Sequence, residues 1–186
     1  MNKNDLFKLT YPIGKFEWTK NPTKAEIKKG ITKLEEFPEK LRKAVADIPE
    51  EVLQNRYRPE GWTIAQVVHH LADSHMHSYL RFKHAILEDT PSIKDYQEAN
   101  WAELPDATNT DLSYSLDLIS ALHKRWTLFL NSLSEIELSK KYLHPEREKH
   151  YPLNTTILIY AWHGEHHLAH IKIQAPGGQI SKWLSL

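Results

Sequence analysis

Apolar residues recur every three or four positions along much of this chain, and this spacing constrains the fold more than any other feature. The most regular run is Leu112, Leu116, Ile119, Leu122, Trp126, Phe129 and Leu133. Such a period places the apolar side chains on one side of an α-helix, where they indicate core packing. Only six glycines occur among the 186 residues. The sequence therefore predicts a mainly helical protein.

Capping residues indicate where two other helices begin. Thr23 is followed three residues later by Glu26, and Thr63 by Gln66, which is the pattern of a capping box. The helix that begins at Thr63 is expected to run to about residue 88. Pro38 is expected to bend or split the helix that begins at Thr23, because proline has no amide hydrogen to donate.

A fourth long helix is expected from Asn154, as its N-cap, to about Gln174, where Pro176-Gly177-Gly178 would end it. The connection 89–110 is a loop of roughly 20 residues, long enough to border a functional site. The segment 140–153 is irregular and has room for a small hairpin. Four long helices with such connections predict an all-α four-helix bundle with long connecting loops, in a single domain of residues 1–186.

The composition excludes several classes of protein. The 24 basic and 24 acidic residues give a formal charge of zero, and no basic stripe indicates nucleic-acid binding. Cysteine is absent, which rules out disulfides, thiolate metal sites and a cysteine nucleophile. The N-terminus lacks the apolar core of a signal peptide, and no apolar run reaches the roughly 20 residues of a membrane span. We expect a cytoplasmic protein that binds neither nucleic acid nor membrane.

Histidines are concentrated in two short windows, 69–84 and 163–170, which hold nine of the twelve. His163 and His167 are four residues apart, so they face the same way on a helix and can bind one metal ion. His166 and His170 form a second such pair, rotated around the helix. A catalytic zinc site has three protein ligands and an open position, so a third ligand is expected from the helix that begins at Thr63.

The sequence alone does not select that third ligand. His70, His77 and His84 recur every seven residues along the flank of the apolar stripe, roughly 10 Å apart, so only one of them can join a given metal. His75 lies nearer the middle of the stripe, and geometry alone prefers it. The competing interpretation of His75, a buried and hydrogen-bonded core histidine, is the one we favour.

The motif differs from that of the zinc peptidases. Their HExxH motif has the catalytic glutamate directly after the first histidine. Here that position is Gly164, and Glu165 lies far around the helix from His167. Peptidase chemistry is therefore not expected.

Three stretches together resemble the DinB-like superfamily, in particular its YfiT branch: GWTIAQVVHHLADSH at 61–75, LTYPIG at 9–14 and WHGEHHLAHI at 162–171. The resemblance spans nearly the whole chain. It implies a four-helix-bundle homodimer and a metal-dependent hydrolase that binds one Zn²⁺ or Ni²⁺ per chain. Matched by motif position, the ligands that it implies are His70, His163 and His167. The resemblance thus overrules the geometric preference for His75.

Three classes of function remain open. The first is a metal-dependent enzyme acting on a small molecule, either a hydrolase that activates a metal-bound water or a transferase of a low-molecular-weight thiol such as bacillithiol, as in some relatives. The second is a metal-binding module without turnover, because no general base is evident and the catalytic groups are unknown. The third is a helical interaction protein whose histidines are incidental.

Other residues have weaker claims to a role in the site. Asp73 lies one turn after His70 and is a possible partner for orienting its imidazole, although pairing with His77 is as good an interpretation. His166, His170 and Glu165 are expected to support the ligands or to lie at a dimer surface. Arg81 could hold an acidic group of a substrate, although a solvated arginine is the better interpretation, and Trp62 and Trp162 are expected to be packing residues rather than a binding cage.

Overall fold

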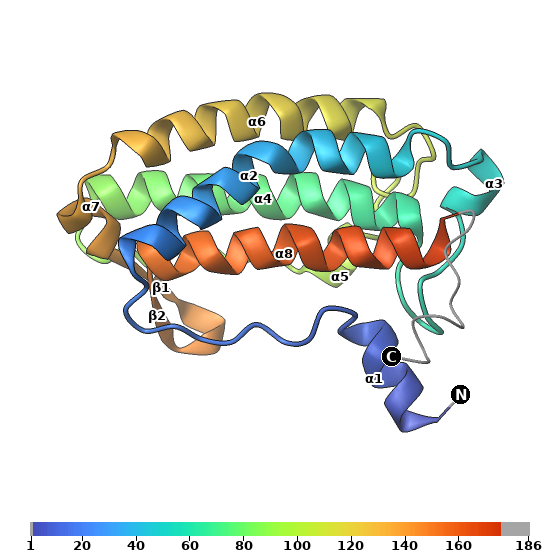
Figure 1. The fold of residues 1–186 in the computed structure, drawn as a ribbon, viewed down its shortest axis with the longest axis horizontal. Coiled ribbons are helices and arrows are strands. Elements are labelled where there is room, and N and C mark those ends of the chain that lie inside the picture. Colours follow the sequence, from blue (N-terminus) through green and yellow to red (C-terminus); the bar gives the residue numbers. More distant parts are fainter. Residues whose placement is uncertain (1, 176–186) are drawn as a thin grey trace.

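The computed structural model describes residues 2–175. Its four long helices are α2 (Lys24–Val45), α4 (Ile64–Leu87), α6 (Ser113–Ser132) and α8 (Leu153–Gln174) (Figure 1). The shorter elements are α1 (Lys3–Thr10), α3 (Glu50–Leu53), α5 (Glu98–Trp101), α7 (Glu135–Ser139), β1 (Lys141–His144), η1 (Pro145–Arg147) and β2 (Lys149–Pro152). The predicted all-α four-helix bundle is confirmed.

The order of the helices around the bundle differs from their order in the chain. Helix α2 packs against α6 and α8, and α4 packs against the same two helices. Figure 1 shows α6 and α8 on opposite sides of the α2 and α4 pair. Helices α2 and α4 are therefore diagonal neighbours, as are α6 and α8, and the long connections 46–63 and 133–152 carry the chain across the bundle.

The core consists of two apolar clusters. One holds Phe37, Leu71, Ile119 and Leu168, and the other holds Leu34, Phe82, Trp126 and Tyr160, each with further members. Burial of one such large side chain stabilises the fold by roughly 1.5–3 kcal/mol.

Two buried histidines and one half-buried histidine lie between the two clusters, one from each of three helices. His75 of α4, His123 of α6 and His163 of α8 each fall between residues of the first cluster and residues of the second along their own helix. The bundle is thus divided by a polar layer.

The long connection after α4 is tied to the bundle at two places. Gln66, the residue that completes the capping box of Thr63, also donates from Nε2 to the Ala102 carbonyl at 2.7 Å. Farther along, the amide of Ile93 donates to the Leu143 carbonyl at 3.0 Å. The predicted loop therefore contains a short helix, α5, and contacts β1.

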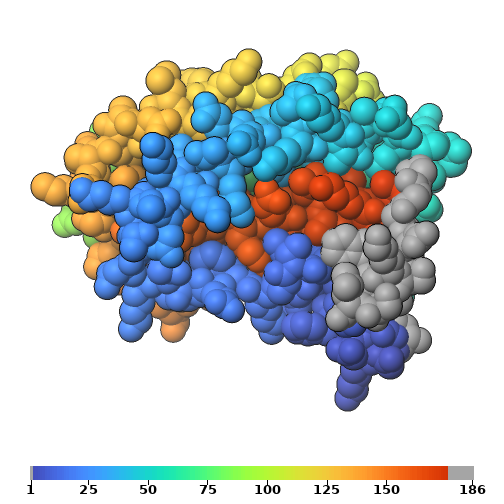
Figure 2. Space-filling model, in the orientation of Figure 1, coloured from blue at the N-terminus to red at the C-terminus, as the bar shows by residue number. Residues whose placement is uncertain are grey.

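Three details differ from the expectations. Helix α2 is not split at Pro38 but continues through it as one helix. Helix α8 begins at Leu153 with Pro152 as its N-cap, because the β1–β2 hairpin leads directly into it. Helix α1 was not expected, and Figure 2 shows the N-terminal residues, in blue, lying along α8. The stop at Pro176-Gly177-Gly178 lies outside the described residues. None of the helices within residues 2–175 is long and apolar enough to cross a membrane.

Candidate metal centre

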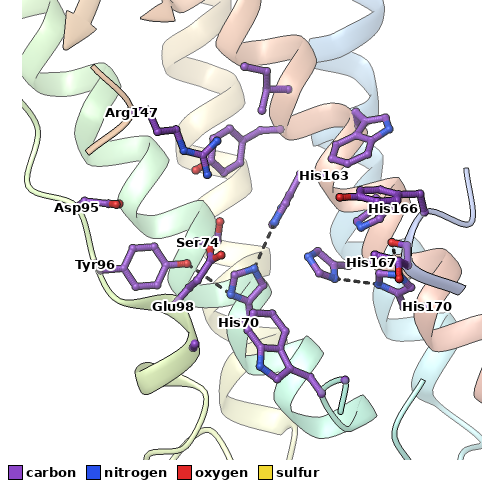
Figure 3. A pocket seen from close by; sticks show the side chains of 18 of the residues that line it. His70, Ser74, Asp95, Tyr96, Glu98, Arg147, His163, His166, His167 and His170 are labelled. Carbon is purple, nitrogen blue, oxygen red and sulfur yellow. Dashed lines mark hydrogen bonds between the residues drawn. The ribbon is translucent and has the colours of Figure 1, made fainter. Parts of the chain in front are cut away.

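Three histidines from two helices converge at one point in the polar layer. His70 comes from α4, and His163 and His167 come from successive turns of α8. Each of them offers one ring nitrogen, and these three atoms lie within 4.8 Å of one another. Figure 3 shows His70 and His163 pointing toward each other, with their Nε2 atoms 3.3 Å apart.

The spacing and charge of these side chains suit a divalent cation. In a tetrahedral zinc site with Zn–N bonds of about 2.0–2.1 Å, two ligand nitrogens lie roughly 3.3 Å apart. Burial lowers the pKa of His70 to about 3, and burial together with the neighbouring imidazoles holds the pKa values of His163 and His167 well below their usual range. The three rings are therefore neutral near pH 7, as metal coordination requires.

A chain of hydrogen bonds determines which nitrogen of His163 carries the proton. The Nδ1 of His163 lies 3.2 Å from the Nε2 of His75, and the Nδ1 of His75 lies 2.8 Å from the Nε2 of His123. The Nδ1 of His123 is 2.6 Å from the carbonyl oxygen of Leu34. We call these residues the inner chain.

The carbonyl at the end of the inner chain can only accept, so His123 donates to it from Nδ1. A neutral His123 then accepts at Nε2, which makes His75 the donor from its own Nδ1. By the same step His163 donates from Nδ1 to His75. The Nε2 of His163 is left unprotonated, with its lone pair toward His70.

Pro38 explains why the Leu34 carbonyl is available to His123. In an α-helix the carbonyl of residue 34 would accept from the amide of residue 38. Proline has no amide hydrogen, so this carbonyl has no donor at the usual position within α2. His123 takes that place from the neighbouring helix α6. The feature that weakens α2 as a helix thus anchors the inner chain.

A second, shorter chain supports His167. The Nδ1 of His167 lies 3.3 Å from the Nδ1 of His170, and the Nε2 of His170 lies 3.3 Å from the carbonyl oxygen of Thr10. Thr10 is the last residue of α1, where helix carbonyls have no intrahelical donor. The same argument makes His167 a donor from Nδ1 and leaves its Nε2 unprotonated. We call His167, His170 and Thr10 the outer chain.

His70 has a partner of a different kind. Its Nδ1 lies 3.5 Å from the hydroxyl of Tyr96, which also interacts with Ser74. Burial raises the pKa of Tyr96, so the phenol stays protonated. A hydroxyl can donate or accept, so His70 can adopt either tautomer. His163 and His167 have fixed tautomers, whereas His70 can adapt.

A second group of histidines, His166, His167 and His170, also has ligand-like spacing. It shares His167 with the first group. In the outer chain both nitrogens of His170 are already engaged, one with His167 and one with Thr10. A cation bound among these three rings would have to break the hydrogen bond between His167 and His170. The first group, with His70 and His163, fits a metal better.

The first group lies on the wall of a cavity of about 690 Å³. Trp62 packs its ring 4.5 Å from that of His70, and Trp162 stacks 4.5 Å from the ring of His166. Both tryptophans line the cavity as well as packing against histidines. A small molecule in this cavity would therefore meet the three histidines directly.

The family of the chain follows from comparison with known proteins. A family model described as the DinB superfamily matches residues 33–171, which include all three converging histidines. The chain belongs to the DinB superfamily.

Individual relatives of this DinB-superfamily chain agree with that assignment. YfiT of Bacillus subtilis is 44% identical over 163 residues, which cover 88% of this chain and 92% of YfiT. A relative from Oceanobacillus iheyensis is 47% identical over 161 residues, which cover 87% of this chain and 92% of that relative. Both carry provisional names as metal-dependent hydrolases.

A solved structure is also similar: "YfiT from Bacillus subtilis is a probable metal-dependent hydrolase with an unusual four-helix bundle topology". It matches with a TM-score of 0.88 and 42% identity, covering 90% of this chain and 95% of that chain. Metal dependence is thus suggested both by these names and by the histidine groups of this DinB protein.

The remaining histidines of α4 do not join the converging three, although His75 is hydrogen-bonded to His163. His75 is fully buried and hydrogen-bonded, which confirms the favoured interpretation. His77 stacks on Tyr96, with ring centroids 4.2 Å apart, and exposed His84 pairs with Glu88. Of His70, His77 and His84, which are seven residues apart, only His70 belongs to the converging group.

One expectation about the other residues was wrong. Arg81 is not solvated but buried, at 8% exposure, because Asp95 of the long connection covers it. His166 and His170 are also buried, because α1 and the segment after it pack over them, and His170 contacts His167 in agreement with one of the two roles expected for it. Asp73 stays a proposal only, since the neighbour that the structure gives to the Nδ1 of His70 is Tyr96.

Gly164 explains physically why the peptidase motif does not occur here. A Cβ atom at this position would lie 2.9 Å from two ring atoms of Phe37. Phe37 in turn stacks on His75 and contacts His123. A glutamate at position 164 would therefore displace the ring that packs against the inner chain. Glu165 instead points outward to Lys40.

Proposed function

We propose that this DinB-superfamily protein is a metal-dependent hydrolase of small molecules, with one Zn²⁺ or Ni²⁺ per chain held by His70, His163 and His167. The observation that carries the proposal is the convergence of three neutral imidazoles, two buried and one half-buried, on the wall of a cavity. The fixed tautomers of His163 and His167 support it, because each presents an unprotonated Nε2.

Three neutral ligands leave the full charge of the cation uncompensated. When bound, such a cation acts as a Lewis acid that makes a water or a thiol acidic enough to react near neutral pH. The protein's own contribution is to hold the three rings in place and keep them unprotonated. The inner and outer chains do this for His163 and His167, while burial keeps His70 neutral and the Tyr96 hydroxyl lies next to its Nδ1.

The test combines metal analysis with activity assays. Protein purified without an affinity tag should contain about one equivalent of zinc or nickel per chain, and His163→Ala should lose it. A panel of esters and amides should then show metal-dependent hydrolysis. Turnover only with a thiol and an electrophile would show a thiol S-transferase instead. Full metal occupancy without any turnover would favour a binding module.

We also propose that the protein is a homodimer, as the family resemblance implies. Helix α6 exposes large apolar side chains on its outer face, with Tyr114 at 78%, Leu118 at 42% and Leu128 at 75% exposure. An apolar face of this kind is typical of a contact with another chain. Light scattering coupled to size-exclusion chromatography should give twice the chain mass, and Leu128→Glu should reduce it. A monomer at all concentrations would contradict this.

A further inference from the structure

Arg81 is a buried cation on the cavity wall that the proposed metal chemistry does not use. It comes from α4, three turns beyond His70. Its Nη2 lies 3.3 Å from Oδ1 of Asp95, and its Nη1 donates to the hydroxyl of Tyr160 at 3.4 Å. Both distances are long for charge-assisted hydrogen bonds. Its Nε is buried and has no hydrogen-bond partner within residues 2–175.

Asp95 compensates Arg81 only in part, because it serves several groups at once. His144 lies 3.5 Å from the same Oδ1 atom, so one carboxylate oxygen faces both the imidazole and the guanidinium. The Nδ1 of His144 is a further buried atom for which the described residues offer no partner. A guanidinium has five N–H donors, and burying them unpaired is costly. This corner of the cavity has unmet hydrogen-bonding capacity.

Arg147 brings a second cation to the same corner. It belongs to η1 between β1 and β2, and both Arg81 and Arg147 act electrostatically on His144. Figure 3 shows Arg147 extending over the cavity at the end away from His167 and His170. The corner is thus bounded by a buried arginine from the bundle and by an exposed arginine from the hairpin.

The charges along the cavity favour an anion once a metal is bound. The lining contains three arginines, Arg58, Arg81 and Arg147, and three carboxylates, Glu60, Asp95 and Glu98, so these charges cancel. Histidine rings that bind a metal are neutral imidazoles, so the three ligands do not compensate a divalent cation. A metal-loaded cavity therefore has a net positive charge.

We propose that the substrate has a carboxylate, which binds to Arg81 and Arg147 while the reacting group of the substrate lies at His70, His163 and His167. This inference rests on the proposed function. Tyr160 connects the two ends, because its hydroxyl contacts Arg81 and its ring lies 5.6 Å from that of His163. A planar guanidinium matches a carboxylate in a bidentate geometry. A phosphate dianion fits less well, because Asp95 lies beside Arg81 and would repel it more strongly.

The test measures whether binding depends on a carboxylate at a fixed distance from the metal. The probes are hydroxamates that bind zinc at one end and have a carboxylate at the other, with linkers of increasing length, each compared with its methyl ester. Isothermal titration calorimetry on the zinc-loaded protein gives both affinities. At the best linker length the acid should bind at least about tenfold more tightly than the ester.

Two variants locate the effect. Arg81→Gln should reduce the ratio of acid to ester affinity to near one and leave the affinities for zinc and for the ester unchanged. The matched control is Arg58→Gln, which removes an arginine that lines the same cavity next to Tyr57 and should keep the ratio. If Arg81→Gln does not fold, Arg147→Gln provides the same comparison from an exposed position.

The outcomes separate this inference from the proposed function. A wild-type ratio near one at every linker length overturns the inference, even though zinc and the esters still bind. The inference is also overturned if the ratio of acid to ester affinity falls in Arg58→Gln and not in Arg81→Gln. It is overturned as well if the zinc-loaded protein binds none of the probes. Failure to bind zinc at all overturns the proposed function, and the inference with it.

Discussion

The inner and outer chains perform the same task in different parts of the molecule. Each ends on a helix carbonyl that has no intrahelical donor, at Leu34 because of Pro38 and at Thr10 because α1 ends there. The inner chain runs through His75 and His123, at 0% and 1% exposure, within the bundle. The outer chain depends on an N-terminal segment that packs on the outside of α8.

This difference shows that the support of the metal centre depends both on the packing of the four long helices and on the docking of the N-terminal segment. The inner chain forms as soon as α2, α4, α6 and α8 pack together, and no water is needed to complete it. The outer chain requires the N-terminal segment to dock as well, and Thr10 is only partly buried. A substitution in the inner chain should therefore weaken zinc binding more than one in the outer chain, because water can replace a lost hydrogen-bond partner more easily near the surface.

Acid should act on both chains together and produce the largest effect. Burial lowers the pKa values of His70, His75, His123, His163, His167 and His170. The unfolded chain takes up these protons below about pH 6.5, so stability is complete above that pH and is lost as the pH falls. Each proton taken up only by the unfolded chain lowers the unfolding free energy by about 1.4 kcal/mol for every pH unit. Six such protons lower it by roughly 8 kcal/mol per pH unit, which is comparable with the stability of a whole domain.

Circular dichroism of the metal-free protein against pH measures this effect. We expect cooperative unfolding between about pH 6 and pH 4.5. The control is His84→Gln, because exposed His84 lies outside both chains and should not shift the midpoint. Native structure persisting at pH 4 would contradict the assignment of neutral, buried histidines.

Removal of a ligand should have the next largest effect. His163→Ala is expected to weaken zinc binding by more than about 100-fold, beyond the range that is typical of outer partners. The matched control is His166→Ala on the same helix, which belongs only to the second histidine group and should change the affinity little. Equilibrium dialysis with zinc measures both. If the two variants reverse this order, the cation is held by the second group.

Interruption of the inner chain should weaken zinc binding by about 10–100-fold. In His123→Phe, His75 has no acceptor for its Nδ1 proton and can turn to the tautomer that donates to His163. That would place the proton of His163 on Nε2. Ile119→Val is the control for stability, since it removes one methyl group from the same helix at a cost of about 1 kcal/mol. An unchanged zinc affinity in His123→Phe would show that the inner chain only packs.

Interruption of the outer chain should have a smaller effect, about tenfold or less. In His170→Phe the ring can still stack on Tyr57, 3.9 Å away in the native protein, but cannot accept from His167. Water can reach His167 in its place. Tyr57→Phe retains the stacking and is the matched control. A loss of affinity larger than that of His123→Phe would reverse the ranking of the two chains.

The smallest effect is expected from Pro38→Ala. The variant restores an amide that competes with His123 for the Leu34 carbonyl, so zinc affinity should fall by less than about tenfold. The same amide repairs the hydrogen bond that proline removes from α2, so the unfolding free energy should rise. The unfolding free energy, measured by chemical denaturation, should therefore rise while the zinc affinity, measured by calorimetry, falls. A fall in both would mean that Pro38 serves only to shape the helix.

Much of the bundle was predictable from the sequence, because it depends on local signals. The capping boxes at Thr23 and Thr63 and the apolar period of residues 112–133 each indicate a helix without reference to the rest of the chain. The spacing of His163 and His167 likewise places both on one helix face. Periodicity did not select His70, because the choice depends on how α4 is rotated against α8.

The support of the site was not predictable, because it depends on contacts between distant segments. His123 stands alone within an apolar period that indicates only core packing, and its acceptor at Leu34 is a backbone atom with no signature of its own. Pro38 was expected only to damage a helix. Arg81 was expected in solvent because its cover, Asp95, comes from a connection whose path the sequence does not specify.

The most direct test is a crystal structure of the zinc-loaded protein with anomalous data at the zinc absorption edge. We expect one peak per chain, at about 2.0–2.1 Å from the Nε2 atoms of His70, His163 and His167. The hydrogen bonds from His163 to His75 and from His167 to His170 should remain in place. A peak among His166, His167 and His170, or coordination through Nδ1 of His163, would contradict it.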